Sequence, residues 1–295
     1  MKLKLASIAL LLLLTAACAP VVTPAPPSPV PETPAPPATD TPLPPINAPV
    51  VPAPALVSIH MFNERHGWGV TEQAVVRTDD GGATWYNLTP PSLTELGYNV
   101  AASDFLDPQT AWLLVMDSGD PMLLTQYHTT DGGLTWTSTP GAFFGGDMHF
   151  LDAAHGWMME QLGVAAGSNA VAIHQTNDGG ATWMRTYVND PTVPGAGDSL
   201  PLGGLKFGLT PLNMQTAWVG GVIYASGMVY LYRTDDGGRT WAQVSLSLPP
   251  GAENAELGFE EMQFVSPADA FLTMRMVADT NQLAVYVSHD GGAAW

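Results

Sequence analysis

Basic residues, cysteine and long apolar segments are all scarce in this sequence of 295 residues. Nine Lys and Arg residues stand against 27 Asp and Glu, which gives a formal charge of −18. This acidic excess argues against nucleic acids as partners, because neutralising phosphates requires Lys and Arg. The single cysteine excludes an intrachain disulfide. Beyond the first 17 residues no window shows sustained helical periodicity, which argues against a helical fold.

The residue patterns that build metal sites and catalytic sites are also missing. The seven histidines show no spacing typical of a zinc site, and the Asp-Gly-Gly turns hold too few ligands for a calcium loop. We therefore expect no metal and no other cofactor. No two carboxylates can be assigned a catalytic separation from the sequence alone. The sequence therefore predicts no catalytic residue and favours a non-enzyme; if the chain is an enzyme, a glycoside hydrolase is the expected class.

One short motif, in five copies, dominates what the sequence does contain. It reads S/T-x-D-x-G-x-T-W and recurs about every 50 residues, with Ala294 in place of threonine in the last copy. A fixed period of this length is typical of a repeat architecture with one supersecondary unit per period. The motif residues to which we assign a structural role are Asp80, Gly82, Trp85, Asp131, Gly133, Trp136, Asp178, Gly180, Trp183, Asp236, Gly238, Trp241, Asp290, Gly292 and Trp295.

Each motif is predicted to form a hairpin turn between two strands. The segment before it is short and rich in β-branched and aromatic residues, as in residues 229–232. The aspartate accepts hydrogen bonds from the backbone that follows it, and the glycines permit positive φ. A small residue followed by an aromatic one precedes each motif and begins another strand. These pairs are Gly67-Trp68, Ala111-Trp112, Gly156-Trp157, Ala217-Trp218 and Ala270-Phe271.

The two patterns together hold all nine tryptophans and imply four short strands per period, which is the blade of a β-propeller. They resemble the Asp-box, or BNR, repeats of sialidases, sortilin-type receptors, some glycan hydrolases and photosystem II stability and assembly factors. The pattern is most similar to the last group. The resemblance covers residues 56–295 and implies an all-β propeller of four-stranded blades. Because those factors have seven blades, the five motif copies imply part of a seven-bladed ring.

The two ends of the repeat region indicate whether the propeller is complete and how its ring could close. The sequence stops at the last motif residue, Trp295, where every other copy continues into a strand, so we expect a C-terminally incomplete propeller at residues 55–295. The alternative is a five-bladed ring in which residues 50–54 supply the outer strand of the fifth blade. Proline is tolerated at such an edge, although two prolines in five residues make a poor ladder.

The first 54 residues have a different composition. Residues 1–17 join a basic start to a short apolar run and resemble a bacterial lipoprotein signal peptide, with Cys18 as the acylated residue. Residues 18–54 are rich in proline, which favours extended polyproline II and cannot build a core. We therefore predict a lipoprotein of the cell membrane or outer membrane, on its extracytoplasmic face. The membrane is contacted through the lipid only, since the apolar run is too short to span it.

Function is less strongly encoded than fold, because one fold hosts many activities. The resemblance to assembly factors implies a non-enzymatic scaffold that binds a protein partner. The alternative is a carbohydrate-binding or glycoside-hydrolase-like propeller of the sialidase superfamily, with a glycan as ligand, although the Arg-Ile-Pro segment of sialidases is absent. Binding residues are expected on the long loops. Those chosen for a binding face are Asp104, Phe144, Asp147, Glu260 and Glu261.

Overall fold

The computed structural model describes residues 45–93, 100–116, 124–141, 143, 145–278 and 280–295. The predicted signal peptide, Cys18 and most of the predicted linker lie outside these residues. Contacts divide the chain after Pro45, and every element named below belongs to the unit Ile46–Trp295. Its described part is built from antiparallel strands and the short 3-10 helix η2 (Ala252–Asn254). None of the described helices is long and apolar enough to cross a membrane.

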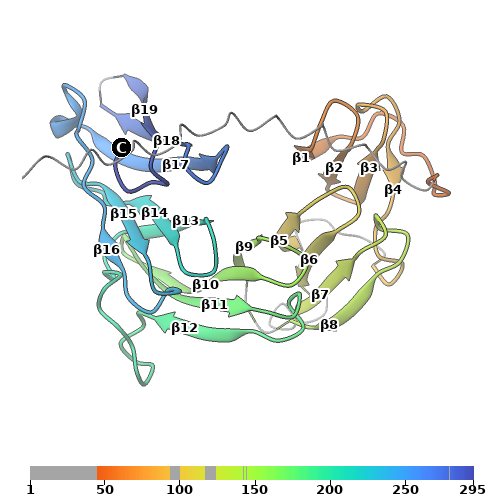
Figure 1. The fold of residues 1–295 in the computed structure, drawn as a ribbon, viewed down its shortest axis with the longest axis horizontal. Helices are drawn as coiled ribbons and strands as arrows, with labels where there is room; N and C mark the ends of the chain where they lie inside the picture. Colours follow the sequence, from red (N-terminus) through yellow and green to blue (C-terminus); the bar gives the residue numbers. More distant parts are fainter. Residues whose placement is uncertain (1–44, 94–99, 117–123, 142, 144, 279) are drawn as a thin grey trace, which may run out of the picture. The chain divides into compact units, whose positions relative to one another are not determined.

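The strands fall into groups that follow the sequence period (Figure 1). Repeat 1 contains β1 (Leu56–Met61), β2 (Gly67–Thr71), β3 (Val75–Thr78) and β4 (Tyr86–Asn87). Repeat 2 contains β5 (Val100–Phe105), β6 (Ala111–Met116), β7 (Leu124–Thr129) and β8 (Thr137–Pro140). Repeat 3 contains β9 (Gly146–Phe150), β10 (Gly156–Ala165), β11 (Ser168–Thr176) and β12 (Met184–Val188). Repeat 4 contains β13 (Leu205–Pro211), β14 (Ala217–Val222), β15 (Tyr230–Thr234) and β16 (Ala242–Gln243).

Repeat 5 contains β17 (Glu256–Phe264), β18 (Ala270–Val277) and β19 (Asn281–Ser288). Within each repeat, consecutive strands pair in chain order. One residue pair, Val222 with Gly258, connects the sheet of repeat 4 to that of repeat 5. The predicted all-β fold with four-stranded antiparallel sheets is therefore confirmed. The number of blades in a complete ring stays a prediction.

The motif turn is closed by hydrogen bonds from its own side chains, as repeat 3 illustrates. Thr176 Oγ1 donates to Asp178 Oδ1 (2.8 Å) and accepts from the N–H of Gly180 (2.9 Å). Asp178 accepts from both the N–H (2.8 Å) and the hydroxyl (2.6 Å) of Thr182. These bonds from Thr182 favour the carboxylate and lower the pKa of Asp178. Gly180 has φ +85°, a conformation that a side chain would strain.

The turn between the first two strands of each repeat is built in a similar way. Asp107 Oδ1 accepts from the N–H groups of Gln109 (2.6 Å) and Thr110 (2.8 Å), which is an Asx turn. This turn also contacts the motif turn, since Gly132 N–H donates to Gln109 O at 2.8 Å. The two turns therefore lie at the same end of each repeat. Equivalent caps come from Asn63, Asp152, Asn213 and Ser266.

Tryptophan indoles connect consecutive repeats. Trp68 Nε1 donates to Asp107 O in repeat 2 at 3.1 Å. Trp136 of the motif donates in the other direction, to Leu88 O of repeat 1 at 2.9 Å. A buried tryptophan thereby combines a large apolar contact with a partner for its N–H. Indole bonds to neighbouring repeats are also made by Trp112, Trp157 and Trp183.

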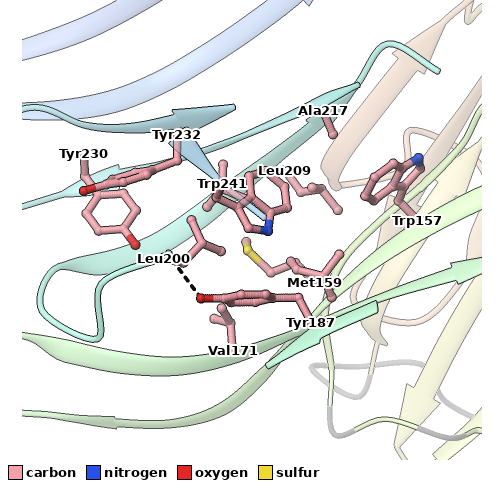
Figure 2. Close-up of a cluster of buried hydrophobic side chains, with 12 residues drawn as sticks. Trp157, Met159, Val171, Tyr187, Leu200, Leu209, Ala217, Tyr230, Tyr232 and Trp241 are labelled. Carbon is pink, nitrogen blue, oxygen red and sulfur yellow. Dashed lines mark hydrogen bonds between the residues drawn. The ribbon is translucent and has the colours of Figure 1, made fainter. Parts of the chain in front are cut away.

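The hydrophobic core lies between consecutive sheets. Figure 2 shows the cluster shared by repeats 3 and 4, in which Trp157 and Tyr187 contribute from one repeat and Leu209 and Trp241 from the next. The Tyr187 hydroxyl accepts the N–H of Leu200 at 2.8 Å and so fixes the connection between the repeats. Each fully buried large apolar side chain contributes about 1.5–3 kcal/mol. The stability of each repeat therefore depends on its neighbours.

A stack of three rings joins repeats 2 and 3. The Trp112 ring lies between His128 (centroids 4.6 Å apart) and Phe150 (3.6 Å), and both pairs are parallel to within 4°. Trp112 Nε1 donates to Gly179 O at 2.8 Å. His128 Nε2 is buried without a hydrogen-bond partner among the described residues. Burial lowers the pKa of His128, because an apolar environment penalises the imidazolium.

When the pH is lowered, the unfolding free energy of this protein should decrease more steeply than that of a His128→Phe variant. The unfolded chain binds a proton near the ordinary histidine pKa of about 6.5, whereas the folded chain binds it at lower pH. The stability supplied by the neutral ring is therefore complete above about pH 6.5 and is lost as pH falls below that value. Urea unfolding at pH 7.5, 6.5 and 5.5 tests this. A constant difference between the two proteins would contradict it.

The repeat unit starts earlier than the sequence predicts. The proline content predicts that residues 46–54 belong to the linker. In the structure, however, Val51 N–H donates to Trp85 O and Asn87 N–H donates to Pro49 O, each at 2.8 Å. Val50 also forms a bridge with Tyr86. Proline lacks an N–H but keeps its carbonyl acceptor, so Pro49 can join a strand edge. In this structure these residues pair with β4 of repeat 1, and not with repeat 5 as the ring-closing alternative requires.

Candidate functional site

The first strands of repeats 1 to 3 place titratable side chains at one repeated position. His60 on β1, Asp104 on β5 and His149 on β9 each pair across the sheet with the tryptophan of the small-aromatic pair. The three residues therefore occupy equivalent places on consecutive sheets. Both histidines act electrostatically on the Asp104 carboxyl, as does Asp147 of β9. We call these four residues the first-strand cluster.

Asp104 is the most buried carboxyl of the first-strand cluster. Its Oδ2 accepts the backbone N–H of Phe150 on β9 at 2.6 Å, which joins β5 to the next repeat. Burial is the largest influence on this carboxyl and raises its pKa, because removal from water penalises the carboxylate. The charge of His149 and the Phe150 N–H oppose that shift. Asp104 therefore keeps its proton to higher pH than an exposed aspartate does.

Asp147 and His149 form an ion pair on β9. Asp147 Oδ1 lies 2.9 Å from His149 Nε2, and Asp147 Oδ2 accepts the N–H of Leu209 on β13 at 2.6 Å. Burial opposes the charged imidazolium, but the bond to Asp147 and the charges of Asp147 and Asp104 outweigh it and raise the pKa of His149. The His149 side chain is 39% exposed to solvent.

A cavity of about 460 Å³ adjoins this pair between repeats 3 and 4. Asp147 forms one side of the cavity, and the exposed ring of Phe207 forms another. Gln161 and Asn169 face it with amides that already bond to each other and to Lys206 O. The remaining lining residues are Gly146, Val164, Leu205 and Lys206.

Lys206 lines this cavity but is only 1% exposed to solvent. It has no carboxylate partner among the described residues. Its Nζ donates to Asn169 O (2.9 Å) and Oδ1 (3.3 Å), Leu202 O (3.0 Å) and Gly204 O (3.0 Å). The ammonium also lies 5.0 Å from the centre of the Tyr230 ring. Burial lowers the pKa of Lys206 to about 8. Its donors are committed to the protein and are not available to a ligand.

The residues chosen from the sequence for a binding face separate into three groups. Asp104 and Asp147 lie together in the first-strand cluster. Glu260 instead forms an ion pair with Arg275, with Nε and Oε1 2.7 Å apart, and Glu261 follows it on β17. Phe144 lies outside the described residues. Neither glutamate is among the residues that line the cavity or act on Asp104.

Sequence reasoning missed His60, His149, Lys206 and Phe207. The two histidines had a usable signal, because they and Asp104 stand at the same spacing before their tryptophans. Lys206 and Phe207 carried no such signal, since their positions depend on how the connection between repeats folds. The described residues hold no group of three or more His, Cys, Asp or Glu placed to bind a metal ion.

The first-strand cluster offers acceptors and proton-exchanging groups rather than an assembled catalytic pair. Asp104 and Asp147 each already accept a backbone N–H from the next repeat. These bonds hold the two carboxyls in fixed positions and connect three consecutive first strands. What remains available to a ligand is the solvent-exposed part of Asp147 and His149, together with the ring of Phe207.

Comparisons of sequence relate the chain to two kinds of protein. It is 26% identical over 264 residues to the photosystem II assembly lipoprotein Ycf48 of Synechococcus sp. (strain CC9902), which covers 81% of this chain and 74% of that protein. It is 30% identical over 205 residues to a xyloglucanase of Paenibacillus sp., covering 57% of this chain and 19% of the enzyme. A probable oligoxyloglucan-reducing end-specific xyloglucanase of Neosartorya fischeri is 26% identical over 227 residues, and the match covers 28% of that protein. No family model matches the chain.

The solved structures that resemble this chain do so at low similarity. Ycf48 bound to D1 peptide is 17% identical with a TM-score of 0.35, covering 83% of this chain and 94% of that one. The GH74 enzyme of Niastella koreensis is 16% identical with a TM-score of 0.47, covering 75% and 34%. The four-stranded sheets and the sequence relatives support the β-propeller fold that the sequence predicts. The chain resembles both an assembly factor and part of a xyloglucanase.

Proposed function

We propose that this chain is a lipid-anchored, extracytoplasmic β-propeller that binds a protein partner as a non-enzymatic scaffold. The observation that carries the proposal is that the carboxyl groups of the candidate site already have partners within the protein. Asp104 and Asp147 accept backbone N–H groups of the next repeat, and Glu260 is paired with Arg275. A general acid or nucleophile must instead be directed at a substrate. These carboxyls are better suited to shaping a surface than to performing chemistry.

The relation to Ycf48 supports the same proposal, since that protein is an assembly lipoprotein and the match extends over 74% of its length. The proposed anchor is Cys18, released from the signal peptide at residues 1–17 and followed by the proline-rich linker. This places the propeller on the extracytoplasmic face of the cell membrane or outer membrane. The complete propeller is a seven-bladed ring in this proposal, and no cofactor is required.

A carbohydrate-active propeller is the second candidate. The observation in its favour is the 30% identity to a xyloglucanase, combined with a cavity that carries an exposed phenylalanine and an aspartate. Aromatic rings and carboxylates are also the groups that bind and hydrolyse sugars. The match covers 19% of that enzyme.

Hydrolysis of xyloglucan separates these two proposals. The mature chain should release no reducing ends from xyloglucan or its oligosaccharides above a protein-free control, because Asp104 and Asp147 are each held by a backbone N–H group of the next repeat. Asp104→Asn and Asp147→Asn variants serve as matched controls. Turnover by the unmodified chain that both variants abolish would overturn the scaffold proposal and favour a glycoside hydrolase.

A crosslinking experiment tests the scaffold directly. A photoreactive residue at position 164, beside the cavity, should give one discrete crosslinked protein in intact cells. The same residue at position 65, in the first turn of repeat 1, should not give it. Equal labelling from both positions, or none from position 164, would contradict the proposal.

A further inference from the structure

Segments 161–169 and 198–207 line part of the cavity between repeats 3 and 4, and two further segments lie beside them, since Leu205 pairs with Val222. The tip of the β10–β11 hairpin meets the connection before β13, since Gly204 N–H donates to Gly167 O at 3.0 Å. The β14–β15 loop meets the segment at η2, since Gly227 N–H donates to Ala255 O at 2.9 Å. Val222 of β14 pairs with Gly258 of β17. These contacts make one continuous surface from residues 161–169, 198–207, 222–229 and 251–258.

Large apolar side chains are exposed on this surface. Val164 is 66% exposed, Tyr224 61% and Phe207 45%. Val164 and Phe207 line the same cavity, and Tyr224 lies over the hairpin tip, where its Cδ2 is 3.5 Å from the position of a Cβ on Gly167. We call Val164, Phe207 and Tyr224 the hairpin surface. Contiguous exposed apolar residues with a polar rim mark interaction sites.

The charge around the hairpin surface is predominantly acidic. The four segments carry the acidic residues Asp198, Glu253 and Glu256, and the cavity adds Asp147. Their one basic residue is Lys206, whose ammonium is enclosed by four oxygens. A ligand at this surface therefore meets apolar rings, the Asp147 carboxylate beside its partner His149, and further acid at the edge.

We infer that the hairpin surface binds an extended segment of a partner protein in which a basic side chain stands among apolar ones. The apolar side chains contact Tyr224 and Val164. The basic group enters the cavity, where it meets the Asp147 carboxylate and the face of the Phe207 ring. Asp147 retains acceptor capacity for this, since a carboxylate has about four lone-pair sites and two are used.

This inference rests on the proposed scaffold function and names the chemistry of its partner. Charge complementarity selects a basic segment over an acidic one. The cavity selects a single long side chain over a broad basic face. An anionic glycan is disfavoured by the same acidic rim.

Peptide binding tests the inference. The probe is a fluorescein-labelled peptide of about ten residues with one central arginine flanked by phenylalanine and leucine, measured by anisotropy with the mature chain. Replacing that arginine by neutral citrulline should weaken binding about tenfold, because a charge-assisted hydrogen bond to the partly exposed Asp147 is lost. Phe207→Ser and Tyr224→Ser should each weaken binding about tenfold, since central aromatic anchors carry most of such an affinity. With Asp147→Asn, the arginine and citrulline peptides should bind almost equally.

Matched variants at the motif end of the repeats control for general charge and hydrophobicity. Glu64→Gln removes an exposed acid and Leu134→Ser an exposed apolar residue, and neither should change the affinity. An unchanged melting temperature and circular dichroism spectrum show that each variant is folded. Equal effects of surface and control variants would overturn the inference, because they would indicate non-specific attraction to an acidic protein.

Two further outcomes separate this inference from the proposed function. If the crosslinked partner persists in the Phe207→Ser chain, the scaffold function stands, but the partner does not insert a basic side chain beside Phe207 and the inference fails. If xyloglucan oligosaccharides bind at the hairpin surface and the peptides do not, both the inference and the scaffold proposal fail.

Discussion

Replacing Trp112 by alanine should lower the free energy of unfolding by about 3–5 kcal/mol, the range found for buried large-to-small aromatic changes. The indole is fully buried, stacks on His128 and Phe150, and donates to Gly179 O of repeat 3. The substitution removes both ring contacts and leaves the Gly179 carbonyl without this donor. Chemical denaturation monitored by circular dichroism measures the change.

Two variants resolve the Trp112 effect into its parts. Trp112→Phe keeps a ring in the stack and loses the N–H, so it should cost about 1–3 kcal/mol. Phe271 occupies the equivalent position in repeat 5 but is 43% exposed, so Phe271→Ala should change stability by less than about 0.5 kcal/mol. An equal loss for Trp112→Ala and Phe271→Ala would mean that contact between repeats is not the source of the stability.

Replacing Lys206 by methionine should destabilise the fold by about 2–4 kcal/mol, because it leaves several buried carbonyl oxygens without a donor. The methionine side chain fills a similar volume, which separates the loss of hydrogen bonds from the loss of packing. The oxygens concerned belong to Asn169, Leu202 and Gly204, so the hairpin tip and the connection before β13 should loosen together. Hydrogen exchange of the 198–207 segment, alongside urea unfolding, tests this.

The Lys206 effect should also depend on pH. The folded protein releases the Lys206 proton near pH 8, whereas the unfolded chain holds it to about pH 10.4. Between these values the unfolded state binds more protons, so the contribution of this group to stability rises with pH. The difference in unfolding free energy between the unmodified chain and Lys206→Met should therefore grow from pH 7 to pH 9.5. A difference that shrinks would show that the carbonyl oxygens hold the proton more strongly than burial removes it.

The repeated turns explain why the fold could be predicted from the sequence. The motif closes on itself through residues a few positions apart, such as Thr176, Asp178 and Thr182, so its geometry needs no distant contact. Local hydrogen bonds of this kind leave a direct trace in sequence. The strands on either side follow from their apolar, β-branched composition.

The candidate site was accessible only in part, because its residues meet through contacts between repeats. The sequence predicts Asp104 and Asp147 in loops before the first strands, whereas the structure places them on β5 and β9. Their bonds to Phe150 and Leu209 depend on how neighbouring sheets align. The Lys206 ammonium is bound mainly by backbone carbonyl oxygens, which every residue possesses. No pattern of side chains in the sequence therefore predicts this arrangement. The sequence also did not predict that residues 46–54 belong to the repeat unit, because Pro49 contributes only its backbone carbonyl to the pairing.

The indole bonds between repeats have an evolutionary consequence. Trp68, Trp112 and Trp136 all donate to main-chain oxygens of a neighbouring repeat. A main-chain acceptor is present whatever residue occupies the position, so the donor requires no particular side chain next to it. Duplication or exchange of a whole unit therefore keeps these particular hydrogen bonds without a matching side chain in the adjacent unit, and loops such as those of the hairpin surface are free to diverge while these bonds persist.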